Sequence, residues 1–391
     1  MTQPVVRPET TPGRSRPTWP RWVVAAALIA SLGIATAGGF ALGKRFAPAN
    51  LLDPLWLRAY LDRPLDHGGP GAGFWVSGYY VDYDAGSLEV VKTRSTHMDQ
   101  VVVFGYGFDQ EGNLEGKETQ LVKGLVAKSK RIILFGNLTD GGFNEDTAHA
   151  ILTDPAVQNR AVENLIAKAT DLDAGGVQID FENIPPTDRD AYTAFLKRLK
   201  GELQPLGMTL SIAAAAKTSD TRTGWGGATD YAAIGQIVDQ FYIMAYDEHW
   251  RGGEPGPVAS LTWTEKVVRY ATGVMPAQKI VLGVPFYGYE WAVNPEEGTK
   301  NNKAYSFSTM SRRVGEMGGT AKWDPVSGEN VATFKVNGSD RVAWWPDERS
   351  LEAKLKLAYQ YNLKGIAAWR LGFEKDDWWE GLGAFRVKPT K

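Results

Sequence analysis

The sequence predicts an α/β fold, a (β/α)8 barrel with a small α+β insertion between its seventh strand and its seventh helix. Eight short runs with strand character recur over residues 74–369, and amphipathic helical patterns lie between most of them, an alternation typical of parallel βα units. Such units over about 300 residues match the usual size of this barrel. A doubly wound sheet is the alternative, but it usually shows a glycine-rich phosphate turn after its first strand. Residues 76–80 contain no such turn.

The N-terminal segment has the composition of a membrane signal. Four arginines lie among residues 1–21, an uncharged run covers residues 22–43, and Lys44 and Arg45 follow. About 20 apolar residues are enough for a helix to cross a bilayer, and the excess of positive charge before the run places the tail in the cytoplasm. We therefore expect a cytoplasmic tail at 1–21 and a transmembrane helix at 22–43, with a cleavable secretory signal as the alternative. With the transmembrane helix, the protein lies in the cell membrane and the rest of the chain is periplasmic or extracellular. With a cleaved signal, the rest of the chain is secreted.

The elements after this segment follow in order. A linker rich in proline and glycine is expected at residues 44–73, and the barrel at residues 74–385. The predicted strands are Phe74–Tyr79, Gln100–Phe104, Arg131–Phe135, Gly176–Asp180, Thr209–Ala214, Gln240–Ala245, Lys279–Pro285 and Gly365–Trp369. The predicted helices are Glu118–Lys128, Pro155–Leu172, Asp188–Gln204, Asp230–Val238, Trp263–Thr272 and Glu348–Tyr361.

A long segment separates the seventh and eighth strands. It is far longer than one helix requires, so we expect an α+β insertion at about residues 288–345. Strand-like pieces lie at Val331–Val336 and Arg341–Trp345, and a helical pattern covers Ser308–Met317. Before the insertion, the run Thr262-Trp263-Thr264-Glu265 fits a capping box, which predicts that a helix begins there.

The composition excludes several classes of function. The chain carries 43 basic and 45 acidic residues, whereas nucleic-acid binders normally carry a basic excess. It contains no cysteine, which excludes disulfides, thiolate zinc sites, iron–sulfur clusters and cysteine nucleophiles. Its four histidines do not lie at ligand spacing, so we expect neither a metal site nor a cofactor. The 14 tryptophans are many for this length, and stacking on sugar rings is one use for them.

Two carboxylates lie at the end of the predicted fourth strand, where barrel enzymes hold their catalytic groups. Side chains alternate between the two faces of a strand, so Gln178, Asp180 and Glu182 point into the barrel. The proximity and burial of Asp180 and Glu182 keep one of the two carboxylic acids protonated near neutral pH. Glycoside cleavage needs such a general acid. The alternative is that this Asp-x-Glu caps the following helix or forms a surface ion pair.

Carboxylates two residues apart on one strand lie on the same side of a bound sugar. They cannot flank the scissile bond, as the acid and the nucleophile of a retaining glycosidase usually do. Either a distant carboxylate is the nucleophile, or the substrate supplies its own through the carbonyl oxygen of a 2-acetamido group. In the second case Asp180 orients the acetamido group and Glu182 protonates the leaving oxygen.

Four of the predicted strands carry motifs that occur in the same order along the chain in one known family. The fourth strand ends in Asp180-Phe181-Glu182, and the sixth ends in Met244-Ala245-Tyr246-Asp247. The first strand contains Gly78-Tyr79-Tyr80, and the last one ends at Trp369. Together these motifs resemble those of glycoside hydrolase family 18, the chitinase-like family, over about residues 74–380.

The resemblance implies a retaining glycosidase that cleaves β-linked, N-acetylglucosamine-containing glycans of the cell envelope by substrate-assisted catalysis. It implies that Glu182 is the acid and then the base, and that Asp180 stabilises the acetamido group. It also implies that Tyr246 and Asp247 hold that group as further catalytic residues. The substrate-binding residues that we expect are Tyr79, Gln178, Met244 and Trp369, and the expected partners are the glycan and the membrane, without nucleic acid.

The fourth strand departs from the family signature Asp-x-x-Asp-x-Asp-x-Glu at two positions. Gly175 and Gln178 replace its first two acids, and Gln178 can hydrogen-bond Asp180 but cannot buffer its charge. With Gln178 and Phe181 at these positions, the sequence resembles a bacterial branch of the family, which contains spore-cortex hydrolases and cell-envelope glycosidases. The two departures keep an alternative open, a catalytically silent, lectin-like barrel tethered to the envelope. A scaffold that only anchors partners is a third explanation.

Further aromatic residues near the strand ends have either a substrate role or a packing role. Those are Tyr106, Trp225, Trp250 and Trp291 and the pairs Trp344-Trp345 and Trp378-Trp379. Asn137 and Asp140 either shape the cleft or lie in a solvated loop, and His249 either contacts sugar or is a surface histidine.

Overall fold

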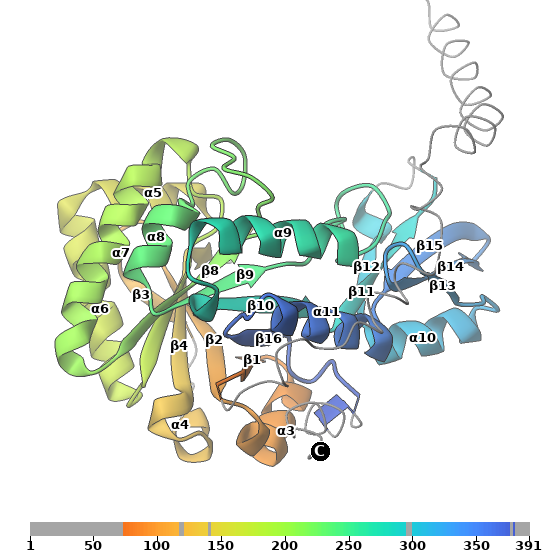
Figure 1. Ribbon diagram of the computed structural model, residues 1–391, viewed down its shortest axis with the longest axis horizontal. Helices are drawn as coiled ribbons and strands as arrows, with labels where there is room; N and C mark the ends of the chain where they lie inside the picture. The colour runs from red at the N-terminus through yellow and green to blue at the C-terminus, as the bar shows by residue number, and fades with distance from the viewer. Residues whose placement is uncertain (1–72, 117–120, 140–141, 295–298, 376–377, 380–391) are drawn as a thin grey trace, which may run out of the picture. The chain divides into compact units, whose positions relative to one another are not determined.

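Eight parallel strands form a closed barrel in the computed structural model, which describes residues 73–116, 121–139, 142–294, 299–375 and 378–379. Around the barrel they follow in chain order, and the last strand pairs with the first to close it (Figure 1). All eight strands predicted from the sequence are confirmed. Their bounds are β1 Trp75–Val81, β2 Gln100–Phe108, β4 Arg131–Gly136, β7 Gly176–Asp180, β8 Thr209–Ala215, β9 Gln240–Met244, β10 Ile280–Pro285 and β16 Gly365–Trp369.

The barrel strands are buried on both faces. Every residue of β7, β9 and β10 is buried, as expected for a parallel sheet that encloses its own core and carries helices outside. Val102, Leu134, Tyr242 and Val281 belong to one cluster inside the barrel. This packed core leaves the carboxyl ends of the strands as the place where polar side chains can meet a ligand.

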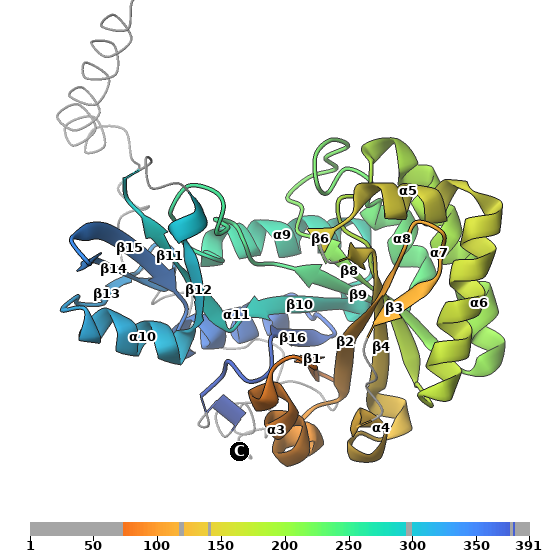
Figure 2. The ribbon, with the colours of Figure 1, turned by 180° about the vertical axis from the view of Figure 1, so that it is seen from behind.

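Helices cover the outside of the barrel (Figures 1 and 2). Five of the six predicted helices have nearly the expected bounds, and α4 covers only part of its predicted range. Helices α3 and α5 were not predicted, and α3 buries only Ser87 and Val91, which is too few for an apolar stripe. The bounds are α3 Ala85–Arg94, α4 Leu121–Leu125, α5 Glu145–Thr153, α6 Pro155–Asp171, α7 Arg189–Leu203, α8 Tyr231–Ile237, α9 Leu261–Val274 and α11 Glu348–Gln360.

The predicted capping box before α9 is wrong. The helix begins at Leu261, and Ser260 is its N-cap, because the Ser260 hydroxyl accepts a hydrogen bond from the backbone nitrogen of Trp263 at 3.3 Å. Thr262 therefore lies inside the first turn. Serine and threonine are both good caps, so residue type alone does not distinguish Thr262 from the observed cap, Ser260.

The insertion after β10 is a five-stranded antiparallel sheet with one helix. Its core contains Phe307, Met310 and Trp345, all of which are fully buried. The prediction of an α+β insertion is confirmed, although β11, which begins directly after β10, was not predicted as a strand. Its elements are β11 Tyr287–Ala292, β12 Lys303–Ser306, α10 Phe307–Glu316, β13 Lys322–Asp324, β14 Glu329–Val336 and β15 Ser339–Trp345.

A buried carboxylate joins the insertion to the segment that follows β9. Glu329 of β14 accepts hydrogen bonds from the backbone nitrogens of Val258 and Ala259 at 2.8 and 2.9 Å. The ammonium group of Lys354 lies 3.9 Å from the same carboxylate, and both side chains are buried. The insertion therefore helps to fix the loop between β9 and α9.

Two short antiparallel pairings lie at the carboxyl ends of the barrel strands. Strand β3 (Leu114–Gly116) pairs with the end of β2, and β5 (Leu138–Thr139) pairs with β6 (Gly142–Phe143). These pairings extend the rim of the barrel beyond β2 and β4.

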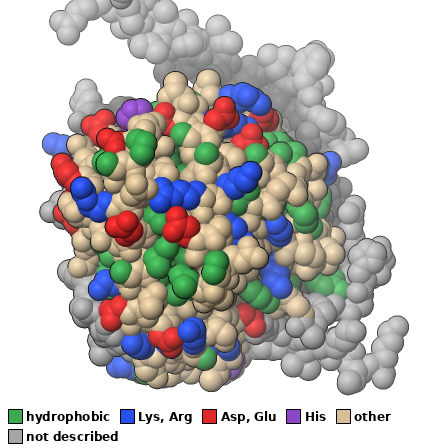
Figure 3. Space-filling view, turned by 90° about the vertical axis from the view of Figure 1, so that its left-hand side faces the viewer, with side chains coloured by type: hydrophobic (Ala, Val, Ile, Leu, Met, Phe, Trp, Pro, Cys, Tyr) green, Lys and Arg blue, Asp and Glu red, His purple; other side chains and the backbone are tan. Residues whose placement is uncertain are grey.

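The predicted transmembrane segment at residues 22–43 lies outside the described residues. Within the described part of the chain, no helix is both long and apolar enough to span a bilayer. Figure 3 shows one face with basic and acidic side chains interspersed, which agrees with the near-neutral balance of the sequence.

Candidate active site

Asp180 and Glu182 lie at the carboxyl end of β7 and share a pocket. Phe181 between them points outward and stacks on Phe195 of α7, with ring centroids 5.7 Å apart. The alternation along the strand therefore directs both carboxylates inward, as predicted. The pocket has a volume of about 250 Å³. It is lined by Tyr79, Phe104, Phe143, Asp180, Glu182, Ala213, Trp225, Met244, Tyr246, Asp247 and Trp369.

Seven of the eight site residues predicted from the sequence line this pocket. Gln178 does not. It is fully buried below Asp180, and its side-chain nitrogen donates a hydrogen bond to the Ser211 hydroxyl at 3.3 Å. The structure therefore places Gln178 under the pocket, not in contact with it.

Packing explains why a glycine stands at position 175, the other departure from the family signature. A Cβ atom at this position would lie 2.3 Å from the carbonyl oxygen of Lys128. Real Cβ atoms essentially never approach backbone that closely, so the local backbone packing leaves no room for an aspartate.

The backbone of Glu182 is clamped by an asparagine from the segment after β4. The Asn137 side chain accepts a hydrogen bond from the nitrogen of Glu182 at 2.9 Å and donates one to its carbonyl oxygen at 2.8 Å. It also donates to the carbonyl oxygen of Asn144 at 2.7 Å. Asn137 is fully buried, so this clamp holds the acid at a fixed height above the barrel.

Burial raises the pKa of both carboxyl groups. It raises the pKa of Asp180 to about 7. It raises that of Glu182 to about 9, helped by the negative charges of Asp180 and Asp247, while the Trp225 side chain lowers it by hydrogen bonding. Because Glu182 has the higher pKa, it holds the proton of the pair at neutral pH. It is therefore the carboxyl group that is able to donate a proton.

Asp180 has one carboxylate oxygen without a hydrogen-bond donor. Its Oδ1 atom is buried and accepts no hydrogen bond within the part of the chain that the structure describes. A buried carboxylate oxygen without a donor is costly. A ligand N–H group that enters the pocket would remove that cost.

Asp247 is held by two tyrosines of the insertion. Its backbone has a left-handed φ of 60°, and its Oδ1 atom accepts hydrogen bonds from the hydroxyls of Tyr287 at 2.5 Å and Tyr289 at 2.9 Å. Burial raises the pKa of Asp247, and the two tyrosines lower it by hydrogen bonding. Both hydroxyls donate to the same oxygen atom of Asp247.

Replacing Tyr289 by phenylalanine is expected to lower kcat/KM about tenfold, because a hydrogen bond to a charged group contributes about 1.5–3 kcal/mol. Loss of that bond raises the pKa of Asp247. Because the activity needs Asp247 as a carboxylate, the acid limb of the pH–rate profile should move to higher pH. A pH–rate profile of the Tyr289→Phe protein measures this shift. Tyr305→Phe on β12 is the matched control, since among the described residues the tyrosines that donate to Asp247 are Tyr287 and Tyr289. An acid limb that stays in place for Tyr289→Phe would contradict the assignment.

The floor of the pocket is aromatic. The Trp369 ring contacts Tyr79 and Phe104 edge-on, with centroid distances of 5.2 and 5.6 Å. Tyr246 is buried, and burial raises its pKa well above the usual value. Its hydroxyl therefore keeps its proton and is able to donate a hydrogen bond to a carbonyl oxygen.

Tyr287 and Tyr289 were not predicted as site residues. Their spacing of two on a strand that follows β10 was the available signal, because it places both side chains on one face. Trp225, weighed earlier between a substrate role and packing, does line the pocket and is 44% exposed.

Most of the other candidate residues near the strand ends do not line this pocket. Trp291, Trp345, Trp378 and Trp379 are buried, which fits a packing role, and Trp250 is exposed. Asp140 lies outside the described residues. His249 lies beside the carbonyl oxygen of Glu254 at 3.1 Å. No group of three metal-ligating side chains forms a cation site within the described ranges.

Comparison with known proteins agrees with this geometry. The profile described as "Glycosyl hydrolases family 18" matches residues 78–374. The cortical fragment-lytic enzyme of Bacillus anthracis is 31% identical over 300 residues, which are 75% of this chain and 70% of that protein. The crystal structure of the Bacillus cereus spore cortex-lytic enzyme SleL has a TM-score of 0.74 at 27% identity, covering 81% and 75% of the two chains. A chitinase from Chromobacterium violaceum has the same TM-score, 0.74, at 25% identity, with 81% and 99% covered.

Proposed function

The chain belongs to glycosyl hydrolase family 18 and is a glycosidase, and from this premise we propose that it cleaves β-linked, N-acetylglucosamine-containing glycans of the cell envelope. We further propose that the substrate's own acetamido group is the nucleophile and that the anomeric configuration is retained. The observation that carries the mechanism is the buried Asp180 oxygen without a donor, beside a Glu182 whose pKa is raised.

The first step begins with the sugar on the aromatic floor at Trp369. The N–H of its acetamido group donates to Asp180, and the carbonyl oxygen, turned toward the anomeric carbon, attacks it. At the same time Glu182 donates its proton to the leaving glycosidic oxygen. The product of this step is a cyclic oxazolinium ion, whose positive charge is stabilised by the Asp180 carboxylate.

The second step consumes a water molecule. Glu182, now ionised, removes a proton from the water, which attacks the anomeric carbon from the side that the leaving group occupied. The carbon–oxygen bond of the oxazolinium ring breaks, and the acetamido group is restored. Two displacements at one carbon give overall retention. Tyr246 and Asp247 hold the acetamido group through both steps.

The geometry favours this mechanism over a second protein carboxylate as nucleophile. Asp180 is the last residue of β7 and Glu182 follows two residues later, so both enter the pocket from the end of one strand. The third carboxylate of the pocket, Asp247, is engaged by two tyrosine hydroxyls. An acetamido group is therefore the nucleophile that the site accommodates best.

An envelope polymer is favoured over chitin by the similarity to cortical fragment-lytic enzymes at 31% identity. A product screen tests the proposal. The full chain would be incubated with peptidoglycan strands, chitooligosaccharides and poly-N-acetylglucosamine, and the fragments identified by mass spectrometry. We expect fragments that end in N-acetylglucosamine, and NMR of the fresh product should show the β-anomer first. Products that first appear as the α-anomer would contradict retention.

The location of the enzyme is a separate part of the proposal. The uncharged run at residues 22–43 and the arginines before it support a membrane anchor with the barrel outside the cytoplasm. Fractionation of cells that express the full chain, followed by protease treatment of intact cells or spheroplasts, tests this. A protein found whole in the cytosolic fraction would contradict it.

A further inference from the structure

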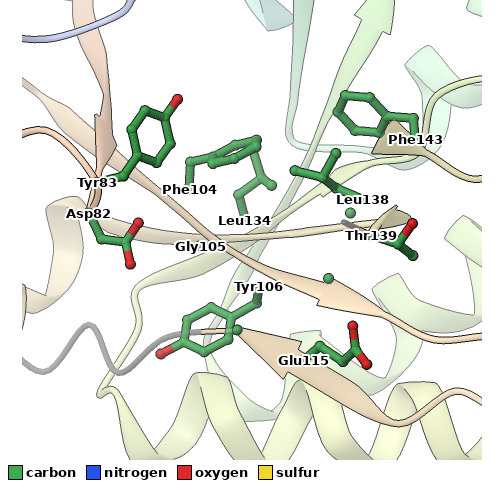
Figure 4. A pocket seen from close by; sticks show the side chains of 13 residues that line it. Asp82, Tyr83, Phe104, Gly105, Tyr106, Glu115, Leu134, Leu138, Thr139 and Phe143 are labelled. Carbon is green, nitrogen blue, oxygen red and sulfur yellow. The ribbon is translucent and has the colours of Figure 1, made fainter. Parts of the chain in front are cut away.

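A second cavity adjoins the pocket that holds the carboxylates. Its volume is about 440 Å³, and it shares Phe104 and Phe143 with the first pocket (Figure 4). It lies at the ends of β1, β2 and β4, and the β2–β3 hairpin forms one side of it. A glycan that fills the first pocket therefore has room for a neighbouring unit here.

The walls of this cavity suit a sugar ring. Tyr83 is 60% exposed, and the guanidinium group of Arg370 lies 5.3 Å from the centre of its ring. Tyr106 also lines the cavity between Asp82 and Glu115 (Figure 4), but its ring is buried and stacks on Phe135, with ring centroids 5.8 Å apart. Tyr83 therefore offers a neighbouring sugar an exposed aromatic ring that also carries a polar hydroxyl group.

Among the described residues that line the cavity, two are acidic and none is basic. Asp82 and Glu115 line it, and neither forms an ion pair with a cation among the described residues. Two described cations near the cavity each pair with another carboxylate. Arg370 pairs with Asp84 at 2.6 Å, and Lys168, which lies over the Tyr106 ring, pairs with Asp171 at 3.7 Å.

We propose that this cavity binds the glycan unit next to the cleaved one and selects a unit with a protonated amino group over a unit with a carboxylate. The inference rests on the proposed function, because the neighbouring unit is defined by the cleaved bond. The carboxylates of Asp82 and Glu115 attract an ammonium group at C2 of a glucosamine unit. They repel the lactyl carboxylate of an unsubstituted muramic acid unit. The substrate class is accordingly a partly de-N-acetylated polymer, with N-acetylglucosamine retained at the cleaved position.

Chitooligosaccharides of one length test this selection. One set would be fully acetylated, and the other would carry a single glucosamine at a known position. The full chain is expected to give a kcat/KM about fivefold higher when the glucosamine neighbours the cleaved bond, the gain expected of one partly exposed charge pair. The preference should weaken as salt is raised from about 0.05 to 0.5 M. Mass spectrometry of the products would place glucosamine at one fixed position beside the new end.

The variants Asp82→Asn and Glu115→Gln are expected to remove most of this preference. Glu111→Gln is the matched control, since Glu111 is exposed on the same hairpin but does not line the cavity. We expect that control to keep the preference ratio of the unchanged chain. A ratio near one in the unchanged chain, or a ratio that Asp82→Asn and Glu115→Gln leave in place, would overturn the inference alone. Cleavage of neither oligosaccharide by a chain that does cleave another glycan of the product screen would also overturn the inference alone. Cleavage of no glycan in that screen would overturn the proposed function, and this inference with it.

Discussion

Replacing Glu182 by glutamine should lower kcat about a thousandfold, because the amide cannot donate a proton to the leaving oxygen and general acid catalysis contributes 10²- to 10⁴-fold. The amide keeps the shape of the side chain, and the Asn137 clamp acts on the backbone of residue 182. Binding of the glycan should therefore change little. Steady-state kinetics and calorimetric titration of one oligosaccharide measure the two quantities separately.

The control for this variant is Glu163→Gln, which removes an exposed carboxylate of α6. We expect that protein to match the unchanged chain in both kcat and affinity. A Glu182→Gln protein with more than a tenth of the original kcat would contradict the role of Glu182 as the acid. Loss of affinity together with kcat would point to a disrupted pocket.

Replacing Asp180 by asparagine should lower kcat about a hundredfold, the scale on which a preorganised electrostatic group acts. The asparagine carbonyl can still accept the acetamido N–H, but it supplies no negative charge to the oxazolinium ion. A second effect concerns pH. The charge of Asp180 raises the pKa of Glu182, so its removal lowers that pKa. Since Glu182 must be protonated to act, the pH at which activity is lost on the alkaline side should fall.

This pair of effects separates a catalytic role from a packing role. A pH–rate profile of Asp180→Asn should show both the lower plateau and the shifted alkaline limb. Asp146→Asn, at an exposed position of α5, should show neither. An alkaline limb that stays in place would contradict the electrostatic link between the two carboxyl groups.

Much of the barrel could be predicted because its signals are local. Each strand is a short apolar run, and β7 and β16 have the bounds that the sequence predicts. The period of two along β7 also predicted correctly that Asp180 and Glu182 face inward and that Phe181 faces the helices. The inward direction of the two active-site carboxylates could therefore be predicted without knowledge of the tertiary structure.

The features that were not predicted depend on contacts between distant residues. The Asn137 clamp joins positions 45 residues apart, and Tyr289 reaches Asp247 across 42 residues from an unpredicted strand. Helix α3 buries too few side chains to leave a period in the sequence. The expectation for Gln178 differed for another reason. The period of two along the strand places Gln178 on the inner face of the barrel, but it does not tell how far into the barrel the pocket extends.

The measurement that tests the central claim most directly is the rate of cleavage as the substrate's acetamido group is made less nucleophilic. A series of otherwise identical oligosaccharides would carry acetyl, fluoroacetyl, difluoroacetyl and trifluoroacetyl groups on the nitrogen of the reacting sugar. If the carbonyl oxygen is the nucleophile held by Asp180, kcat/KM should fall steadily with each fluorine, because electron withdrawal weakens that oxygen. A rate that does not depend on fluorination would show that another group attacks the anomeric carbon, and the mechanism assigned to Asp180 and Glu182 would be wrong.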